Sequence, residues 1–276
     1  MSDAFVGLLL LGILVGMFGT LIGAGGGFIL VPVLLLLYPK ALPETVTAIS
    51  LGVVFFNATS GSIAYARMGR IDYRSGIIFA IVTVPGAIFG ALSTGLVPRH
   101  LFNAVFGILM VAACIYLLFR GSYTPDEEQI TGRFRMNRKI IERSGVEHRF
   151  SYDVRPGIVI SAGVGYVSSF LGIGGGIIHV PALNRMLNFP VHIATATSHF
   201  ILAIMALAGT IVHIVSGSFA DGGSFRTIVI GIGAVAGAQA GALLARRIGG
   251  GLIIRSLAVA LGIAGVRIAC MAWQAQ

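Results

Sequence analysis

The sequence predicts an all-α, polytopic membrane protein with two repeats of about four helical segments each, and three observations predict it. Of the 276 residues, 56% are hydrophobic and only 11% are charged, with a mean hydropathy of +0.94. The charges are clustered between apolar runs of about 17 to 25 residues, the length of a helix that spans a bilayer. The two halves also share a glycine-rich motif. So few charges cannot cover a water-soluble fold of this length, and the runs lack the alternation of a β-barrel.

Eight apolar segments follow one another along the chain: 4–37, 46–66, 76–96, 101–119, 156–187, 191–216, 227–245 and 252–273. We therefore expect a first membrane repeat (1–119), a hydrophilic cytoplasmic connecting loop (120–155) and a second membrane repeat (156–276). The first segment is too long for a signal-peptide core, so it is expected to stay in the mature chain. The loop holds eight basic and six acidic residues. The net charge of +9 therefore does not indicate a nucleic-acid partner.

The internal repeat is carried by two glycine-rich motifs. Gly23-Ala-Gly-Gly-Gly-Phe-Ile-Leu-Val-Pro32 and Gly172-Ile-Gly-Gly-Gly-Ile-Ile-His-Val-Pro181 agree at seven of ten positions. The likeness continues where Thr47-Ala-Ile-Ser50 matches Thr195-Ala-Thr-Ser198. Weaker counterparts are Gly86 and Gly90 in the first half, and Gly237 and Gly241 in the second. The chain is therefore expected to be a duplicated bundle.

The first segment of each half is expected to be broken at its glycines. A straight helix from 4 to 37 would be about 50 Å long, well beyond the hydrocarbon thickness. Glycine lowers helix stability, and the prolines at 32 and 181 cannot donate to the preceding turn. We expect the chain to unwind near Gly23–Gly27 and Gly172–Gly176 and to restart as a short helix.

The basic residues indicate how the broken segments run. If each one turns back as a re-entrant pair, fifteen Lys and Arg residues fall on one side and three on the other, Arg267 being left out. If each one crosses once, the division is twelve to six. The re-entrant arrangement obeys the positive-inside tendency better and relates the two halves by inversion. The single crossing stays open as the alternative.

The glycine breaks are the predicted binding site. Unwound backbone is tolerated in a bilayer only where it is buried in protein or lines a cavity, and N–H groups at a restarted helix attract anions. The other role of such clusters is close helix packing. Hydroxyl groups follow each cluster, and the amide of Asn57 follows the first; these groups could donate to an anion. The predicted substrate-binding residues are Gly25, Gly26, Gly27, Gly174, Gly175, Gly176, Thr47, Ser50, Asn57, Thr197, Ser198 and His199.

Ionisable residues at membrane depth are scarce. No Asp or Glu lies well inside a predicted span, which argues against a carboxylate proton relay. His199 could couple a proton to the anion, or it could be held by interhelical hydrogen bonds; His179 favours the second role. Two histidines without a third ligand predict no metal site, and no cofactor is expected. The sequence has no nucleophile elbow, zinc-protease motif or phosphate-loop lysine, so we do not expect an enzyme.

The duplicated G-x-G-G-G-h-h-h-V-P motif (h mostly apolar), followed in each half by a helix start rich in Thr, Ala and Ser, resembles the TauE/SafE sulfite exporter family, also called the toluene sulfonate uptake permease family. The resemblance covers nearly the whole chain apart from 120–155. It implies a multi-pass carrier of the bacterial inner membrane for sulfur-containing anions such as sulfite or small organosulfonates, with export favoured. The expected partners are the anion and the lipid bilayer, and a homodimer stays open. An uptake permease and a non-transporting membrane scaffold are the alternatives.

Overall fold

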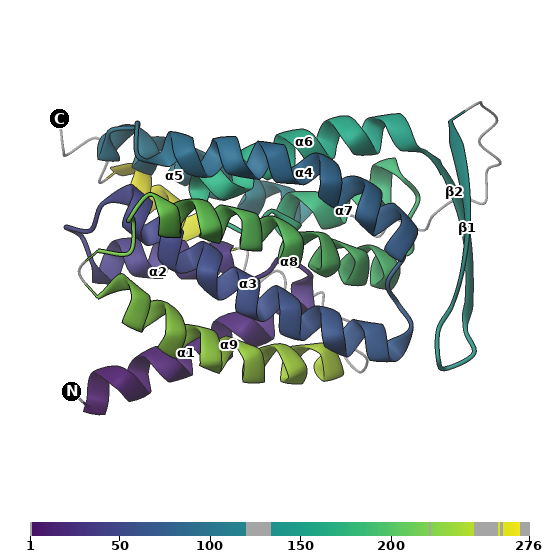
Figure 1. Cartoon of the computed structure of the whole chain (residues 1–276), viewed down its shortest axis with the longest axis horizontal. Helices are drawn as coiled ribbons and strands as arrows, with labels where there is room; N and C mark the ends of the chain where they lie inside the picture. The colour runs from purple at the N-terminus through teal and green to yellow at the C-terminus, as the bar shows by residue number, and fades with distance from the viewer. Residues whose placement is uncertain (1, 120–133, 221, 246–258, 260–261, 271–276) are drawn as a thin grey trace.

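The computed structural model describes residues 2–119, 134–220, 222–245, 259 and 262–270. It is an all-α bundle with one β-hairpin at its end (Figure 1). Seven of the described helices are long and apolar enough to cross a membrane. The elements in chain order are α1 (Ser2–Ile22), α2 (Gly27–Leu37), α3 (Pro43–Met68), α4 (Tyr73–Thr94), α5 (Arg99–Phe119), β1 (Arg135–Ile141), β2 (Glu147–Asp153), α6 (Val154–Leu171), α7 (Gly176–Met186), α8 (Val191–Val215) and α9 (Gly223–Leu244).

Both predicted helix breaks are present. α1 ends at Ile22 and α2 begins at Gly27, while α6 ends at Leu171 and α7 begins at Gly176. Three glycines in each break have positive φ: Gly23, Gly25 and Gly26 in the first, and Gly172, Gly174 and Gly175 in the second. Residues with a Cβ rarely adopt this conformation, which is why the breaks need glycine. α2 and α7 have eleven residues each, enough for only about half of the hydrocarbon thickness.

Contacts between the connectors define two ends of the bundle. At one end, Arg99 donates to the Ala41 carbonyl at 2.5 Å, and the Arg226 guanidinium lies 4.0 Å from the centre of the Tyr38 ring. At the other end, the hairpin lies against the α3–α4 connector (69–72) and the α7–α8 connector (187–190). We call this second end the basic end.

The first segment of each half re-enters the end from which it starts. α2 ends at the connector that holds Tyr38, and α1 runs parallel to α9, which starts beside the same connector. α6 starts directly after β2 at the basic end, and α7 also ends there. Figure 1 shows α1 starting, and α2 ending, at the end of the bundle opposite the hairpin. This path is the one that the fifteen-to-three division of basic residues favoured.

Helices of one half pack closely on helices of the other half at glycines. α1 packs on α9 and α6 packs on α4, so each broken helix lies against the opposite half. A Cβ at Gly16 would lie 2.3 Å from the Ala234 carbonyl oxygen, and one at Gly237 would lie 2.1 Å from that of Ile13. A Cβ at Gly90 would lie 2.3 Å from the Tyr166 carbonyl oxygen. The repeated glycines beyond the motif therefore allow backbones to touch, as small residues do in membrane bundles.

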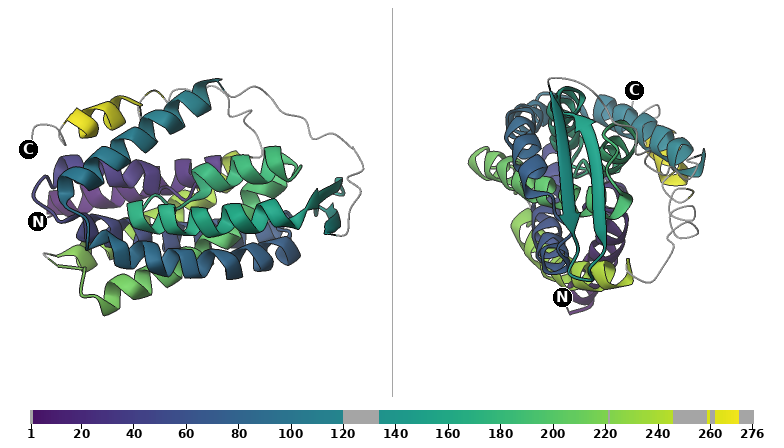
Figure 2. Two further views of the ribbon diagram at one scale, coloured as in Figure 1. Left: turned by 90° about the horizontal axis from the view of Figure 1, so that it is seen from above. Right: turned by 90° about the vertical axis from the view of Figure 1, so that its right-hand side faces the viewer.

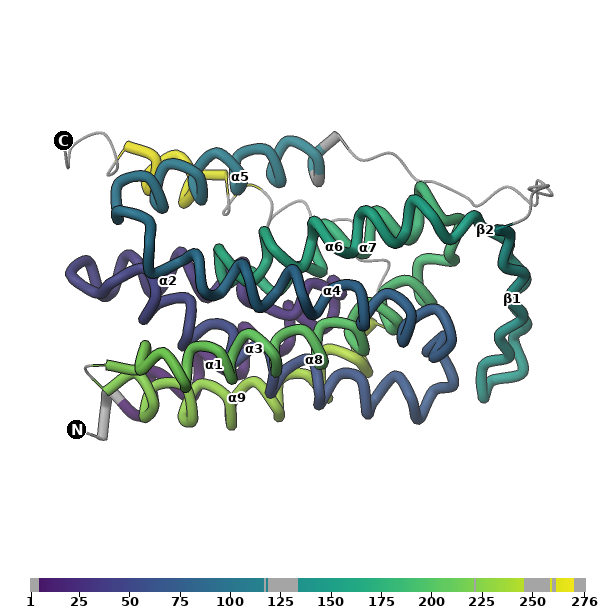
Figure 3. Tube along the Cα trace, turned by 45° about the horizontal axis from the view of Figure 1, so that its top comes forward, coloured from purple at the N-terminus to yellow at the C-terminus, as the bar shows by residue number. Residues whose placement is uncertain are grey.

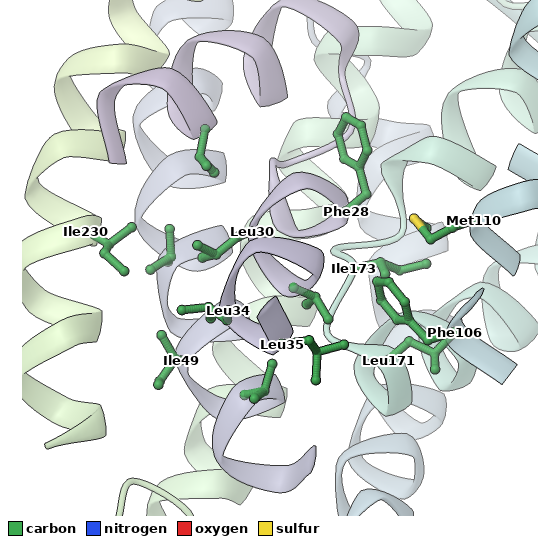
Figure 4. Close-up of a cluster of buried hydrophobic side chains, with 14 of the residues drawn as sticks. Phe28, Leu30, Leu34, Leu35, Ile49, Phe106, Met110, Leu171, Ile173 and Ile230 are labelled. Atoms are coloured by element: carbon green, nitrogen blue, oxygen red, sulfur yellow. The ribbon is translucent and has the colours of Figure 1, made fainter. Parts of the chain in front are cut away.

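An apolar core surrounds α2. Phe28, Leu30, Leu34 and Leu35 are buried and point toward residues of α3, α5, α9 and the second break (Figure 4). On the outer side of this core, α5 runs beside the helical segment 262–270 (Figure 3), where a Cβ at Gly107 would lie 2.8 Å from the Ala269 Cβ. Most of the predicted last span, 252–273, lies outside the described residues.

The region 120–155 is not only a loop, as the sequence analysis expected. Residues 120–133 lie outside the described residues, but 135–153 form an antiparallel hairpin in which Arg135 pairs with Asp153 and Ile141 with Glu147. Figure 2 shows this hairpin across the end of the helices. Phe150 and Tyr152 alternate with more exposed neighbours on β2, a period-two pattern. The high charge of the region masked that pattern.

Candidate substrate site at the meeting of the glycine breaks

The two glycine breaks touch each other at the centre of the bundle. A Cβ at Gly27 would lie 2.4 Å from the Gly172 carbonyl oxygen, and a Cβ at Gly176 would lie 2.2 Å from that of Gly23. All six predicted glycines are buried. The tertiary structure therefore brings the two motifs, about 150 positions apart in the sequence, into direct backbone contact.

The predicted serines bind the carbonyl groups of the opposite break. Ser50 of α3 donates to the Gly172 carbonyl at 2.6 Å. Ser198 of α8 faces the Gly23 carbonyl at 3.5 Å, a longer and weaker contact. The same crossed relation holds for both pairs, so the hydroxyls that follow one motif belong spatially to the other motif.

The predicted threonines serve different partners. Thr47 packs on Gly172, but its hydroxyl donates to its own helix at the Pro43 carbonyl, 2.8 Å away. Thr197 accepts a hydrogen bond from the backbone N–H of Asp72, 3.1 Å away, at the start of α4. The hydroxyl of Thr197 therefore faces the basic end of the bundle.

Asn57 braces the first break. Its side-chain amide donates to the Gly25 carbonyl at 2.8 Å and accepts from the Thr20 hydroxyl at 2.9 Å. Tyr65 adds a hydrogen bond from its hydroxyl to the Thr20 carbonyl, also 2.9 Å. The sequence analysis missed Thr20 and Tyr65, although Thr20 stands three residues before the first motif.

Both restarted helices present backbone donors that have no acceptor among the described residues. In α2 these are the N–H groups of Gly26, Gly27 and Phe28, since Ile29 is the first residue after the break to donate, to Gly26. In the second break they are those of Gly174, Gly175 and Ile177. The first N–H groups of a helix carry the positive end of its dipole, so they favour an anion.

Several buried side chains near the breaks also lack partners. The hydroxyls of Ser168 and Ser169, four and three residues before the second motif, make no hydrogen bond with the described residues. Neither ring nitrogen of His199 makes one of normal geometry; its ring packs edge-on against Tyr65 and interacts weakly with the Thr195 backbone. The sequence analysis missed Ser168 and Ser169, whose only signal is their place before the motif.

His179 is less free, because its Nε2 lies 3.0 Å from the Ser161 hydroxyl. This contact is the structural role that the sequence analysis favoured for it. In the described part of the chain, no three His, Cys, Asp or Glu side chains come together as metal ligands. Among the described residues, Asp72 and Glu142 are the buried carboxylates, and both lie at the basic end. The polar groups at the breaks are therefore neutral donors.

A polytopic bundle in which two re-entrant pairs meet at a buried, polar centre is the architecture of a secondary membrane transporter. Comparison with protein families gives a match to the family described as sulfite exporter TauE/SafE over residues 8–268. The chain belongs to this family. It is a multi-pass inner-membrane transporter and not an enzyme.

Curated relatives agree with this assignment. The chain is 34% identical to the "Probable membrane transporter protein YunE" of Bacillus subtilis, over 78% of this chain and 80% of that protein. It is 28% identical to a protein of Methanocaldococcus jannaschii also named as a probable membrane transporter, over 75% and 71%. A shorter match, 29% identical over 38% of this chain and 24% of the other, is to "Sulfite exporter TauE/SafE family protein 6" of Arabidopsis thaliana. No solved structure matches.

Proposed function

We propose that this transporter carries small sulfur-containing anions, sulfite or organosulfonates, and that it exports them. The observation that carries the proposal is the contact of two helix restarts at which several N–H groups have no acceptor among the described residues. An anion that leaves water needs such donors in compensation. The family description, sulfite exporter, supports the substrate class and the direction. An uptake permease for a related sulfonate is the second candidate.

In this proposal the anion lies between the glycine loops, held by backbone N–H groups and nearby hydroxyls. The proposed site comprises Gly25, Gly26, Gly27, Gly174, Gly175 and Gly176, which supply the backbone, and the side chains around them, Thr47, Ser50, Asn57, Thr197, Ser198 and His199. Two features argue for backbone donors over a fixed cation. Every Lys and Arg of the described part except Arg267 lies at an end of the bundle or in the hairpin, and Arg267 is exposed. Donors without a full charge neutralise the anion only in part, which lets it leave again.

We further propose that the halves are inverted repeats and that transport follows alternating access. The crossed contacts of Ser50 and Ser198, and the opposite ends at which α1 and α6 start, support this relation. The centre then opens in turn to each side of the membrane.

The basic end is proposed to be cytoplasmic, because most Lys and Arg residues of the described chain lie there. Single cysteines at Ser144, in the hairpin turn, and Ser216, at the opposite end, test this in a background without Cys114 and Cys270. An impermeant maleimide should label 216 in intact cells and reach 144 only after lysis. The reverse pattern would overturn the orientation.

Transport itself is tested with purified protein in liposomes loaded with radiolabelled sulfite. Counterflow exchange driven by external sulfite, sulfoacetate, taurine or sulfate ranks the substrates and separates a carrier from a channel. Gly175→Val should abolish exchange, because φ at this position is +63° and a Cβ would lie 2.4 Å from the Ser168 hydroxyl oxygen. Gly163→Ala is the matched control, since nothing lies within 4 Å of a Cβ there. A folded Gly175→Val protein that exchanges sulfite like the parent would place the site elsewhere, and a parent without exchange for any of these anions would favour a scaffold.

A further inference from the structure

The β-hairpin joins both halves of the transporter at the basic end. Phe150 and Tyr152 of β2 pack on Phe189 of the α7–α8 connector, with ring centres 4.5 and 5.0 Å apart. On the other side, Arg70 of the α3–α4 connector forms an ion pair with Glu142, 2.9 Å away. The ion pairs of Glu142 and Arg138 thus reach the first half, while aromatic rings contact both halves, since the Tyr152 ring also lies 6.2 Å from the Phe79 ring of α4. An isolated two-stranded hairpin is only marginally stable, so its order here depends on this docking.

The strongest contact of the hairpin is made by Arg138 with Asp72. The guanidinium reaches both carboxylate oxygens, with Nη2 at 2.6 Å and Nε at 2.9 and 3.1 Å. The Asp72 side chain is fully buried, and its other partner is Ser75, whose hydroxyl lies 2.5 Å from Oδ2 and 2.5 Å from the Tyr152 hydroxyl. A buried carboxylate without its cation is strongly unfavourable. Asp72 therefore needs either Arg138 or water.

Asp72 also connects this ion pair to the proposed substrate site. Its backbone N–H donates to the Thr197 hydroxyl at 3.1 Å. Thr197 directly precedes Ser198, which faces the Gly23 carbonyl of the first break. Asp72 is therefore linked through Thr197 and Ser198 to a carbonyl group of the first glycine break.

We propose that the Arg138–Asp72 ion pair is a latch that closes the basic end of the transporter, and that both residues position Thr197 and Ser198 at the substrate site. This inference rests on the proposed alternating access. With the hairpin docked, the connectors of both halves are held together and water is kept from Asp72. When Arg138 leaves, Asp72 becomes hydrated, and the same step opens the route from the basic end to the glycine breaks.

Accessibility of a reporter cysteine tests the latch. Ala196 is buried at the basic end, beside Ile71 and Tyr65, so Ala196→Cys in a background without Cys114 and Cys270 reports entry of an impermeant maleimide from that end. Arg138→Gln should be labelled at least about tenfold faster than the parent, since it leaves the buried carboxylate without its charge partner. Arg149→Gln is the matched control, because this hairpin arginine is exposed and contacts only Glu147 among the described residues. Equal labelling of the Arg138→Gln variant and the parent would overturn the latch.

Transport kinetics in the same liposomes separate positioning from loss of folded protein. An open latch should lower the maximal exchange rate and also change the apparent KM for substrate added at the basic end, whereas a folding defect lowers the rate alone. Arg138→Lys, which keeps the charge but not the two-oxygen contact, should give intermediate labelling, and parent-like or Gln-like labelling of this variant would contradict the bidentate contact as the cause. If the parent exchanges no anion at all, the proposed function fails; if the parent exchanges anion and Arg138→Gln keeps its KM and labelling rate, only the latch fails.

Discussion

The two glycine breaks have nearly the same sequence but different surroundings. The first is braced by Asn57, which binds both the Gly25 carbonyl and Thr20. In the second half, Met205 stands where Asn57 would be, and Ser168 and Ser169 have no hydrogen-bond partner among the described residues. Buried polar groups are nearly always satisfied, and exceptions point to a functional need. The first break is thus held by side-chain hydrogen bonds, whereas the second has two serine hydroxyls nearby without a partner among the described residues.

Among the variants that compare the two breaks, the largest effect is expected where the breaks touch. Gly176→Ala adds a Cβ that would lie 2.2 Å from the Gly23 carbonyl oxygen, so the loops must separate. We expect exchange to fall on the order of tenfold or more, equal to about 1.4 kcal/mol or more of lost interaction. Exchange assays in liposomes measure it, with Gly163→Ala as the control. Parent-like exchange would show that contact between the breaks is dispensable.

A second pair of variants compares a bonded side chain of the first break with an unbonded hydroxyl near the second. Asn57→Ala leaves the Gly25 carbonyl and Thr20 hydroxyl without their partner and should destabilise the protein by about 1–3 kcal/mol. Ser169→Ala removes no hydrogen bond of the described residues and should change stability by less than about 0.5 kcal/mol. Thermal unfolding in detergent compares the two. Equal loss of stability would contradict the difference between the breaks, and weaker sulfite binding by Ser169→Ala alone would sharpen it.

His199 is a further difference between the surroundings of the two breaks, because its counterpart in the first half is Leu51. Its ring nitrogens make no hydrogen bond of normal geometry with the described residues, and it lies beside Gly61 and Tyr65. We expect His199→Gln to reduce the dependence of transport on pH, because glutamine is of similar size but does not titrate. Uptake into liposomes at a series of pH values measures this. An unchanged profile would assign His199 to packing.

The smallest effect concerns how the hairpin holds the two halves. Burial disfavours ionised Glu142, but hydrogen bonds from His148 and Arg70 outweigh it, so the pKa of Glu142 lies below its ordinary value of 4.5. A lowered pKa means that docking is fully supported above pH 4.5 and weakens as the pH falls through the lowered value. His148 and nearby His192 also lie beside Glu142. The aromatic contacts to the second half do not titrate in this range.

Hydrogen exchange of the hairpin amides at pH 7 and pH 3.5 measures this loss after correction for intrinsic rates. The amides next to Glu142 should lose protection at low pH, while those next to Phe150 keep more of it. In Glu142→Gln, the difference between the two pH values should be absent. Loss of protection along both strands to the same degree would show that charges hold both halves.

Sequence reasoning was most reliable where one residue type has one physical use. The glycine breaks could be predicted because only glycine tolerates the positive φ of Gly25 and Gly174 without strain. The re-entrant path followed from the distribution of Lys and Arg. The hairpin was missed because Arg138 and its neighbours read as a solvated loop until Asp72, far away in the sequence, provides a partner. The role of Asn57 as a brace was equally hidden, since an amide can donate to a ligand or to a carbonyl.

The sequence by itself determined that this is a helical membrane protein, the positions of the two breaks and the family. Each depends on composition or on local backbone preference, which the chain carries without reference to distant residues. The tertiary structure alone decided that the two motifs touch, that Ser50 and Ser198 cross to the opposite break, and that Arg138 reaches Asp72. These contacts join residues more than 60 positions apart, and their energies depend on burial and distance, which exist only once the helices have packed.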